Sequence, residues 1–115
     1  MEAARLQLEK LPNSNGNHTV TRLEGKLSLE TVSNFLQSMR PEPSAHLILD
    51  MSGVVFLDSA GVGALVQLFV HRRNVGQTFA LASLTQQGNA VMQVSGLLKL
   101  MPVFSTVEEA LAQHA

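Results

Sequence analysis

Residues 46–76, HLILDMSGVVFLDSAGVGALVQLFVHRRNVG, restrict the possible folds of this chain more than any other segment. The segment opens with two apolar runs, residues 47–51 and 54–57, which are typical of buried strands on either side of a tight connection. Asp58 and Ser59 follow at once, and the apolar spacing after them predicts a helix over residues 59–75 that ends at Gly76. A buried strand that leads directly into a helix is the repeating unit of α/β folds.

The first turn of the predicted helix reads Ser-Ala-Gly-Val-Gly-Ala, so small side chains leave its backbone amides accessible. The first N–H groups of a helix lack internal partners and carry the positive end of the helix dipole, an arrangement that favours anions. We therefore interpret Ser59 as a serine that carries a removable phosphate. The alternative is capping alone, because Ser and Asp are both common at helix starts. Asp58 is predicted to be an N-cap, a magnesium ligand during phosphotransfer, or both.

The N-terminal part of the chain predicts a hairpin followed by a helix. Residues 5–10 and 18–23 alternate between apolar and polar, and the turn formers between them include the pair Asn15-Gly16. Gly25 is expected to end the second strand, and Ser28 to cap a helix over residues 29–39. The apolar face of that helix is Leu29, Val32, Phe35, Leu36 and Met39.

The C-terminal part continues the alternation of strands and helices. Residues 78–83 and 97–103 are predicted strands, with a helix between them that Ser83 or Thr85 caps and Gly96 stops. Thr106-Val107-Glu108-Glu109 is a capping-box pattern before a last helix. Alternation of this kind implies right-handed crossovers and a mostly parallel sheet. We expect one α/β domain over residues 1–115, with a mixed sheet of about four to six strands, an N-terminal hairpin and about four helices packed mainly on one side.

Composition narrows the functional classes. The 115 residues are 45% hydrophobic, which suffices for one core. The absence of cysteine excludes disulfides and thiolate metal sites. The net charge of -1, without clustered Lys or Arg, argues against nucleic acid as a partner. The chain has no apolar run of the roughly 18 residues that cross a bilayer, and no basic segment leading into an apolar one at its start. We therefore expect a cytoplasmic protein without membrane contact.

An enzyme is not expected. His18, His46, His71 and His114 fall in unlike elements, with no acidic residue or cysteine at ligand spacing, so the sequence predicts no metal site. A serine hydrolase would need a histidine base, and no Gly-x-Ser-x-Gly motif is present. Gly61-x-Gly63 lacks the rest of a nucleotide fingerprint, so no cofactor is predicted.

A family resemblance rests on Asp50-x-Ser52 followed by Phe56-Leu57-Asp58-Ser59-Ala60-Gly61-Val62-Gly63. This pattern resembles the signature of STAS domains, the fold of anti-sigma factor antagonists and of the cytoplasmic tails of sulfate transporters. Gly76, Ser95-Gly96-Leu97 and the terminal Glu-Glu-Ala-Leu fit the same pattern. The family often has a second serine where this chain has Ala60, which leaves Ser59 as the acceptor.

The resemblance implies a partner-switching module. The unmodified protein would bind an anti-sigma factor that is also a serine kinase of the histidine-kinase-like ATPase type. Phosphorylation of Ser59 would release it, and a serine phosphatase would reset the cycle. The alternative is a soluble STAS subunit of an ABC-type lipid or anion transport complex, as a structural or regulatory partner of the ATPase. Members of that branch often alter the serine or its neighbours, so an intact Asp-Ser-Ala-Gly favours the switch.

A helical wheel from Ser59 divides the helix into two faces. One face, Gly61, Ala64, Leu65 and Leu68, is expected to pack on the sheet. The other carries Ser59, Val62, Gly63, Val66 and Val70, where a solvent-facing helix would normally be polar. Exposed apolar patches mark contact surfaces, so the predicted docking face is Ser59, Val62, Gly63 and Val66. Asp58, Asp50, Ser52 and Gly61 are the predicted supports of the phosphorylation site.

Overall fold

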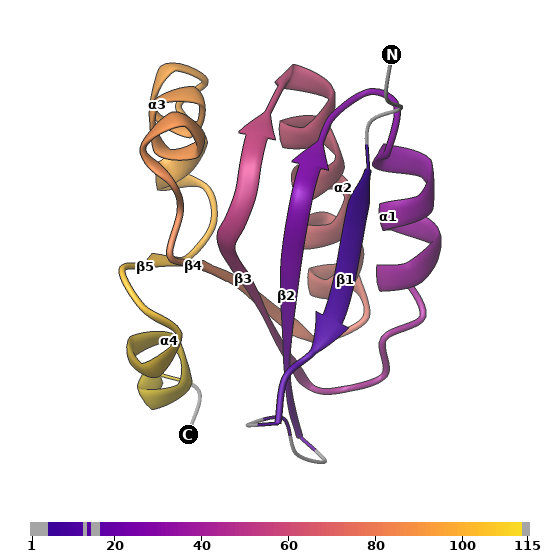
Figure 1. Ribbon diagram of the computed structural model, residues 1–115. Helices are drawn as coiled ribbons and strands as arrows, with labels where there is room; N and C mark the ends of the chain where they lie inside the picture. Colours follow the sequence, from indigo (N-terminus) through magenta and orange to yellow (C-terminus); the bar gives the residue numbers. More distant parts are fainter. Residues whose placement is uncertain (1–4, 13, 15–16, 114–115) are drawn as a thin grey trace.

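The computed structural model describes residues 5–12, 14 and 17–113. This part of the chain forms one sheet in the order β1-β2-β3-β4-β5, where β1 pairs antiparallel with β2 and all later neighbours are parallel (Figure 1). The predicted α/β fold with an N-terminal hairpin is confirmed. The strands are β1 (Leu6–Lys10), β2 (His18–Leu27), β3 (His46–Leu57), β4 (Thr78–Ala82) and β5 (Val103–Phe104). The helices are α1 (Val32–Met39), α2 (Ser59–Asn74), α3 (Gln86–Val94) and α4 (Val107–Gln113), with a 3-10 turn, η1, at Leu97–Lys99.

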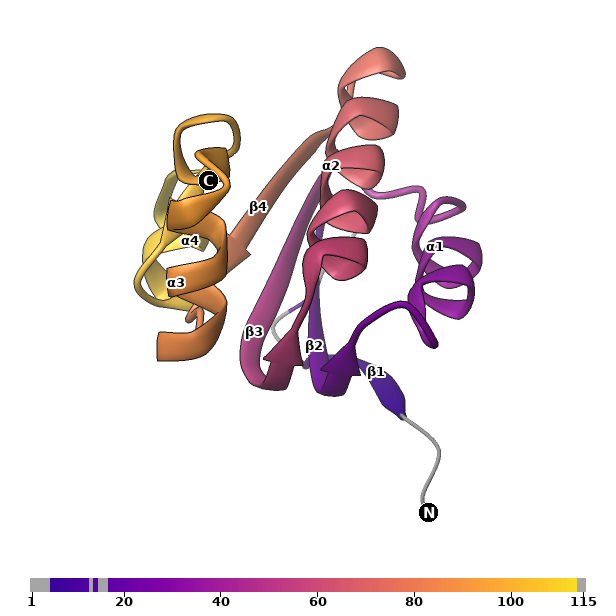
Figure 2. The same ribbon diagram turned by 90° about the horizontal axis from the view of Figure 1, so that it is seen from above.

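The two faces of the sheet have separate cores, because successive side chains of a strand point to opposite faces. Leu47 and Leu49 of β3 belong to the larger core, together with side chains of α1 and α2 and with Met92 of α3. Ile48 belongs to a smaller core that α4 covers with Val107 and Ala110. Figure 2 shows α1 and α2 on one side of the sheet and α4 on the other. The helices therefore lie mainly over one core, as expected, and α4 is the exception.

β3 is one continuous strand, so the predicted tight connection between residues 51 and 54 is wrong. Arg22 pairs with Asp50 and Glu24 with Gly53, which leaves one residue of β2 opposite two residues of β3. A second shift lies between the pairs made by Gly25 and Lys26. Such β-bulges disturb the alternation of side chains without ending the strand. The sequence pattern predicted a connection here because the bulges interrupt the alternation of apolar and polar side chains.

β2 continues to Leu27, so the predicted end of the strand at Gly25 is also wrong. Gly25 has a φ of +117°, which glycine adopts readily, and a Cβ there would collide with the Arg5 carbonyl oxygen. The Lys26 N–H donates to that same carbonyl oxygen at 2.8 Å. Glycine here allows a close approach between neighbouring segments. The predicted turn at Asn15-Gly16 lies outside the described residues.

The start of α1 differs from the prediction. The helix begins at Val32, and Leu29 is 74% exposed and not in the core. Ser28 does not cap it. Instead the Ser28 N–H donates to the Thr31 hydroxyl at 3.0 Å, and that hydroxyl donates to the Lys26 carbonyl at 2.8 Å. These side-chain bonds hold residues 28–31 in a turn, and such bonds compete with helix formation.

The C-terminal region confirms two predicted caps and corrects one strand. Thr85 caps α3 by accepting from the Gly88 N–H at 3.1 Å, and Thr106 accepts from the Glu109 N–H at 3.1 Å. The predicted strand over residues 97–103 is wrong. Gly96 has a φ of +77° and leads into η1, and β5 has only two residues. Pro102, directly before β5, has no N–H for a strand ladder.

Arg72 of α2 is fully buried and bonds only to backbone carbonyls. Its guanidinium donates to the carbonyls of Thr78 at 2.7 Å, Glu42 at 3.2 Å and Ser44 at 2.7 Å. Burial lowers the pKa of Arg72, and the charge of Glu42 opposes that shift. The side chain joins the end of α2 to the start of β4 and to the segment before β3. No helix in the described part of the chain is long and apolar enough to cross a membrane.

Candidate functional site

Asp58 holds the start of α2. Its Oδ1 accepts from the Gly61 N–H at 2.8 Å, which is an N-cap bond, and its Oδ2 accepts from the Leu29 N–H at 3.1 Å. The Val62 N–H donates to the Asp58 carbonyl at 2.9 Å and begins the helical ladder. The predicted role of Asp58 as the N-cap is therefore confirmed. The same carboxylate also fixes the segment before α1 against the first turn of α2.

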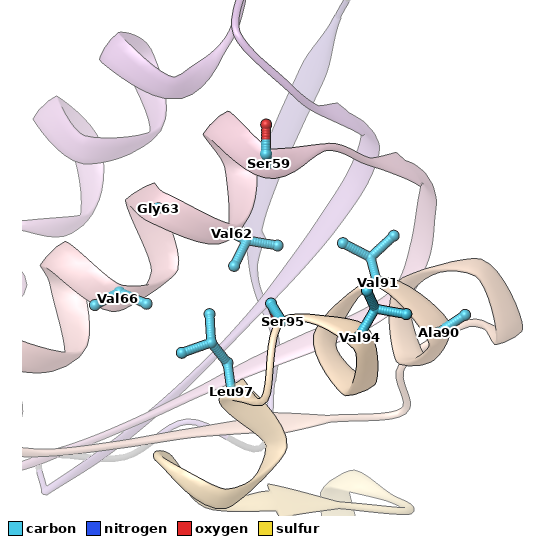
Figure 3. Close-up of a pocket in the computed structure, with 9 residues that line it drawn as sticks. All are labelled: Ser59, Val62, Gly63, Val66, Ala90, Val91, Val94, Ser95 and Leu97. Atoms are coloured by element: carbon cyan, nitrogen blue, oxygen red, sulfur yellow. The ribbon is translucent and has the colours of Figure 1, made fainter.

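Ser59 is the first residue of α2 and its side chain is exposed. In Figure 3 its hydroxyl points away from the labelled residues of α3. None of the described residues forms a hydrogen bond with this hydroxyl. Another protein can therefore reach the oxygen that the sequence predicted to be modified.

The first turn is less receptive to an anion than its small side chains suggested. The Asp58 carboxylate already accepts from the Gly61 amide and already places negative charge at the positive end of the helix dipole. A phosphate on Ser59 would stand next to that carboxylate in the chain. The two negative charges would repel each other at this end of the helix.

Gly61 and Gly63 differ in their surroundings. Gly61 is buried, and a Cβ on it would collide with the Leu27 carbonyl oxygen and meet a Leu57 methyl group at 2.8 Å. A Cβ on Gly63 would meet nothing within 4 Å. Gly61 thus lets α2 approach the end of β2, where the helix starts. Gly63 has no such role in the fold.

Gln87 of α3 is a positioning residue that the sequence pattern did not predict. Its side-chain amide donates to the Leu57 carbonyl at 2.8 Å and accepts from the Leu57 N–H at 2.9 Å. Leu57 is the last residue of β3, directly before Asp58 and Ser59. The pair of bonds therefore fixes the backbone that carries the serine. Polar residues are common in the first turn of a helix, so the sequence did not indicate that Gln87 bonds to the end of β3.

The predicted docking face on α2 is only partly exposed. Val62 is 5% exposed, so the prediction of an exposed side chain there is wrong, whereas Gly63 and Val66 are half-buried and Val70 is 45% exposed. The reason is that α3 and η1 lie beside this part of α2 (Figure 3). Between them runs a groove of about 670 Å³. It is lined by Ser59, Val62, Gly63 and Val66 on α2 and by Ala90, Val91, Val94, Ser95 and Leu97 opposite.

Asp50 and Ser52 are not brought to Ser59. From Asp50 to Leu57 the extended strand covers roughly 23 Å at 3.3 Å per residue. Asp50 accepts from the Ser52 N–H at 3.0 Å and lies 3.7 Å from Arg22 Nε. Both residues therefore stabilise the first bulge of β3. Of the predicted supports, Asp58 and Gly61 are at the serine.

His18 and His46 are neighbours, although the sequence placed them in unlike elements. They pair across β2 and β3, and their ring centroids are 4.7 Å apart. His46 Nδ1 lies 2.7 Å from the Thr78 hydroxyl. Burial lowers the pKa of His46, and the nearby charges of His18 and Arg72 lower it further. Within the described residues no three metal-binding side chains come together, and His114 lies outside that range.

Comparison with known proteins places this geometry in a family. The family model described as STAS domain matches residues 10–110. The chain belongs to the STAS domain family. The resemblance seen in the residues around Ser59 is thereby confirmed. The STAS match contains β2 to β5 in full and only the last residue of β1.

Named proteins similar to this STAS domain include anti-sigma factor antagonists and, in fold alone, a sulfate transporter family protein. It is 24% identical over 98 residues to the Anti-sigma F factor antagonist of Paenibacillus polymyxa, which covers 82% of this chain and 84% of that protein. The unphosphorylated form of the Bacillus anti-sigma factor antagonist SpoIIAA superposes with a TM-score of 0.75 at 25% identity, over 95% of both chains. A sulfate transporter family protein from Wolinella succinogenes superposes with a TM-score of 0.76 at 17% identity, over 87% of this chain and 86% of that one.

Proposed function

We propose that this STAS domain is an anti-sigma factor antagonist of a bacterial partner-switching pathway, controlled by phosphorylation of Ser59. The unphosphorylated form binds an anti-sigma factor that is a serine kinase of the histidine-kinase-like ATPase type. The observation that carries the proposal is an exposed serine hydroxyl at the rim of an uncharged, apolar groove. The names of the Paenibacillus relative and of SpoIIAA support the choice of partner, and SpoIIAA itself has been solved in a phosphorylated form.

The switch works through charge. A phosphoserine carries about -1.5 to -2 charges at neutral pH. Asp58 is adjacent in the chain and already negative, and the groove lining offers no cation to compensate. A partner that covers the groove would have to bury the new charge unpaired, which is costly. A loss of about 2.7 kcal/mol corresponds to roughly 100-fold weaker binding.

The chain is the substrate in this cycle and supplies no catalytic group. The kinase transfers a phosphoryl group from ATP to the Ser59 oxygen and releases ADP, and the nucleotide and its metal belong to the kinase. A serine phosphatase hydrolyses the ester and restores the hydroxyl. Because sigma factors act on RNA polymerase, the cycle belongs in the cytoplasm, and neither nucleic acid nor membrane contacts this domain.

The test is intact mass spectrometry after incubation with ATP and the candidate anti-sigma kinase from the same organism. We expect the mass of one phosphate to be added to the wild-type chain and none to Ser59→Ala. Failure of the wild type to be modified, or equal modification of Ser59→Ala, would contradict the proposal. Circular dichroism shows whether the variant is folded.

No observation favours the transport alternative over the switch. The likeness to the Wolinella protein, at 17% identity, concerns the fold alone. Copurification with an ABC-type ATPase, together with no binding to any serine kinase, is the result that would favour it.

A further inference from the structure

The groove beside Ser59 has a second wall that the predicted docking face did not include. Val94, in the last turn of α3, is 90% exposed, and Val91 one turn earlier is half-buried. Figure 3 shows Val62 of α2 and Val91 of α3 on facing sides of the groove, with Leu97 opposite Val66. An almost fully exposed valine beside other apolar side chains forms a patch that stabilises nothing in the monomer.

Gly63 gives the groove a bare segment of helix backbone. Glycine within a helix destabilises the helix relative to alanine, because its backbone loses more conformational entropy on folding. At Gly63 no neighbouring atom lies within 4 Å of where a Cβ would stand, so packing does not require glycine. A glycine that the fold does not need, in the wall of a groove, allows another backbone to approach α2 closely.

The residues that line the groove also restrict which kind of partner segment can bind in it. All its residues are uncharged, and the two hydroxyls, Ser59 and Ser95, belong to exposed residues. A charged segment would lose its hydration without gaining a partner. A groove between two helices suits the apolar face of a third, which is a common way for proteins to recognise each other.

We infer that the groove between α2 and α3 receives an amphipathic helix of the anti-sigma factor, which lies with its backbone near Gly63 and contacts Val94. The inference rests on the proposed function and extends its contact surface from α2 to α3. Ser59 lines this groove at its rim, so a phosphate there adds negative charge at the edge of the surface that the bound helix covers. The same helix cannot remain seated without burying the charge.

The experiment measures the affinity of the kinase that modifies Ser59 for folded variants of the full chain, by calorimetry. Val94→Glu places a charge in the groove and is expected to weaken binding about tenfold or more. Val75→Glu is the matched control, because Val75 is 55% exposed at the far end of α2 and does not line the groove. Its affinity is expected to stay within about twofold of the wild type. Gly63→Ala is expected to raise the unfolding temperature and yet weaken binding.

A photo-reactive residue at position 94 identifies the occupant. We expect it to crosslink to an amphipathic helical segment of the kinase, and the crosslink to disappear once Ser59 is phosphorylated. A crosslink only to a second copy of this chain would overturn the inference. So would wild-type affinity in both Val94→Glu and Gly63→Ala while Ser59→Glu binds poorly, and the proposed function would then still stand. If the wild type itself does not bind, the proposed function fails and the inference with it.

Discussion

Gly61 and Gly63 lie two residues apart in α2 and illustrate two different reasons for a glycine. The first is required by the backbone of β2, and the second is required by nothing in the monomer. Sequence alone cannot separate them, because both precede a small or apolar residue in the same helical turn. The two glycines differ in the atoms that an added Cβ would meet, so substitution by alanine is predicted to have opposite effects on stability at the two positions.

Gly61→Ala is expected to lower the free energy of unfolding by about 2 kcal/mol or more, because the Leu27 carbonyl cannot move away from the added methyl without disturbing β2. Gly63→Ala is expected to raise it by about 0.5–1 kcal/mol, because the backbone loses less entropy on folding. Urea denaturation of both variants measures the two values. Equal changes would show that the surroundings of the two glycines are alike.

Arg72 is a second single residue with a large expected effect. Arg72→Met keeps an unbranched side chain but leaves the carbonyls of Thr78 and Ser44, of which the Ser44 carbonyl is buried, without their donor. We expect a loss of about 3 kcal/mol or more in the free energy of unfolding. The neighbouring Arg73→Met is the control, because Arg73 is exposed, and it should change stability by less than about 0.5 kcal/mol. A small effect of both substitutions in urea denaturation would contradict this assignment.

At the level of elements, α3 does more than cover the core. Its Gln87 bonds both backbone groups of Leu57, so the end of β3 is tied to a helix that follows it by about thirty residues in the sequence. Its Val94 forms the second wall of the groove. The position of Ser59 therefore depends on an element whose sequence carries no recognisable motif.

Gln87→Ala is expected to destabilise the fold by about 1–2 kcal/mol and to increase amide hydrogen exchange at Leu57, because that N–H loses its acceptor. Gln86→Ala is the matched control, since Gln86 is adjacent and exposed. It should change neither quantity measurably. If Leu57 exchanges at the same rate in all three proteins, Gln87 does not hold the end of β3.

For the molecule as a whole, stability is expected to fall on acidification. The pKa of His46 is lowered from its ordinary value of 6.5 by burial and by His18 and Arg72. Below pH 6.5 the unfolded chain therefore binds a proton that the folded chain resists, and stability decreases.

Glu42 acts at more acidic pH. Burial raises the pKa of Glu42, but hydrogen bonds from Ser44 and Thr19 outweigh this effect and lower the pKa below 4.5. The stability that Glu42 contributes is therefore present above pH 4.5 and is lost as the pH falls through the lowered pKa of Glu42.

Thermal unfolding between neutral pH and pH 5 measures the histidine contribution. His46→Gln is expected to flatten the decline in this range. An identical decline in the wild type and His46→Gln would contradict the assignment to His46.

The parts of the molecule that follow from local patterns were predictable. The hairpin, the helix after Ser59 and the Thr85 cap follow from alternation, apolar spacing and capping residues. The bulges of β3, the late start of α1 and the short β5 were not, because they depend on partners distant in the sequence. The exposure of Ser59 agreed with its helix position, whereas Val62 was buried by α3, an element that a helical wheel of α2 cannot include.

The central claim is that a phosphate on Ser59 ends the interaction with an anti-sigma kinase. The most direct measurement compares the kinase affinity of the unmodified domain with that of the domain phosphorylated at Ser59, in the same buffer and by the same method. We expect roughly 100-fold weaker binding of the phosphorylated form, equivalent to about 2.7 kcal/mol. Equal affinities of the two forms would contradict it.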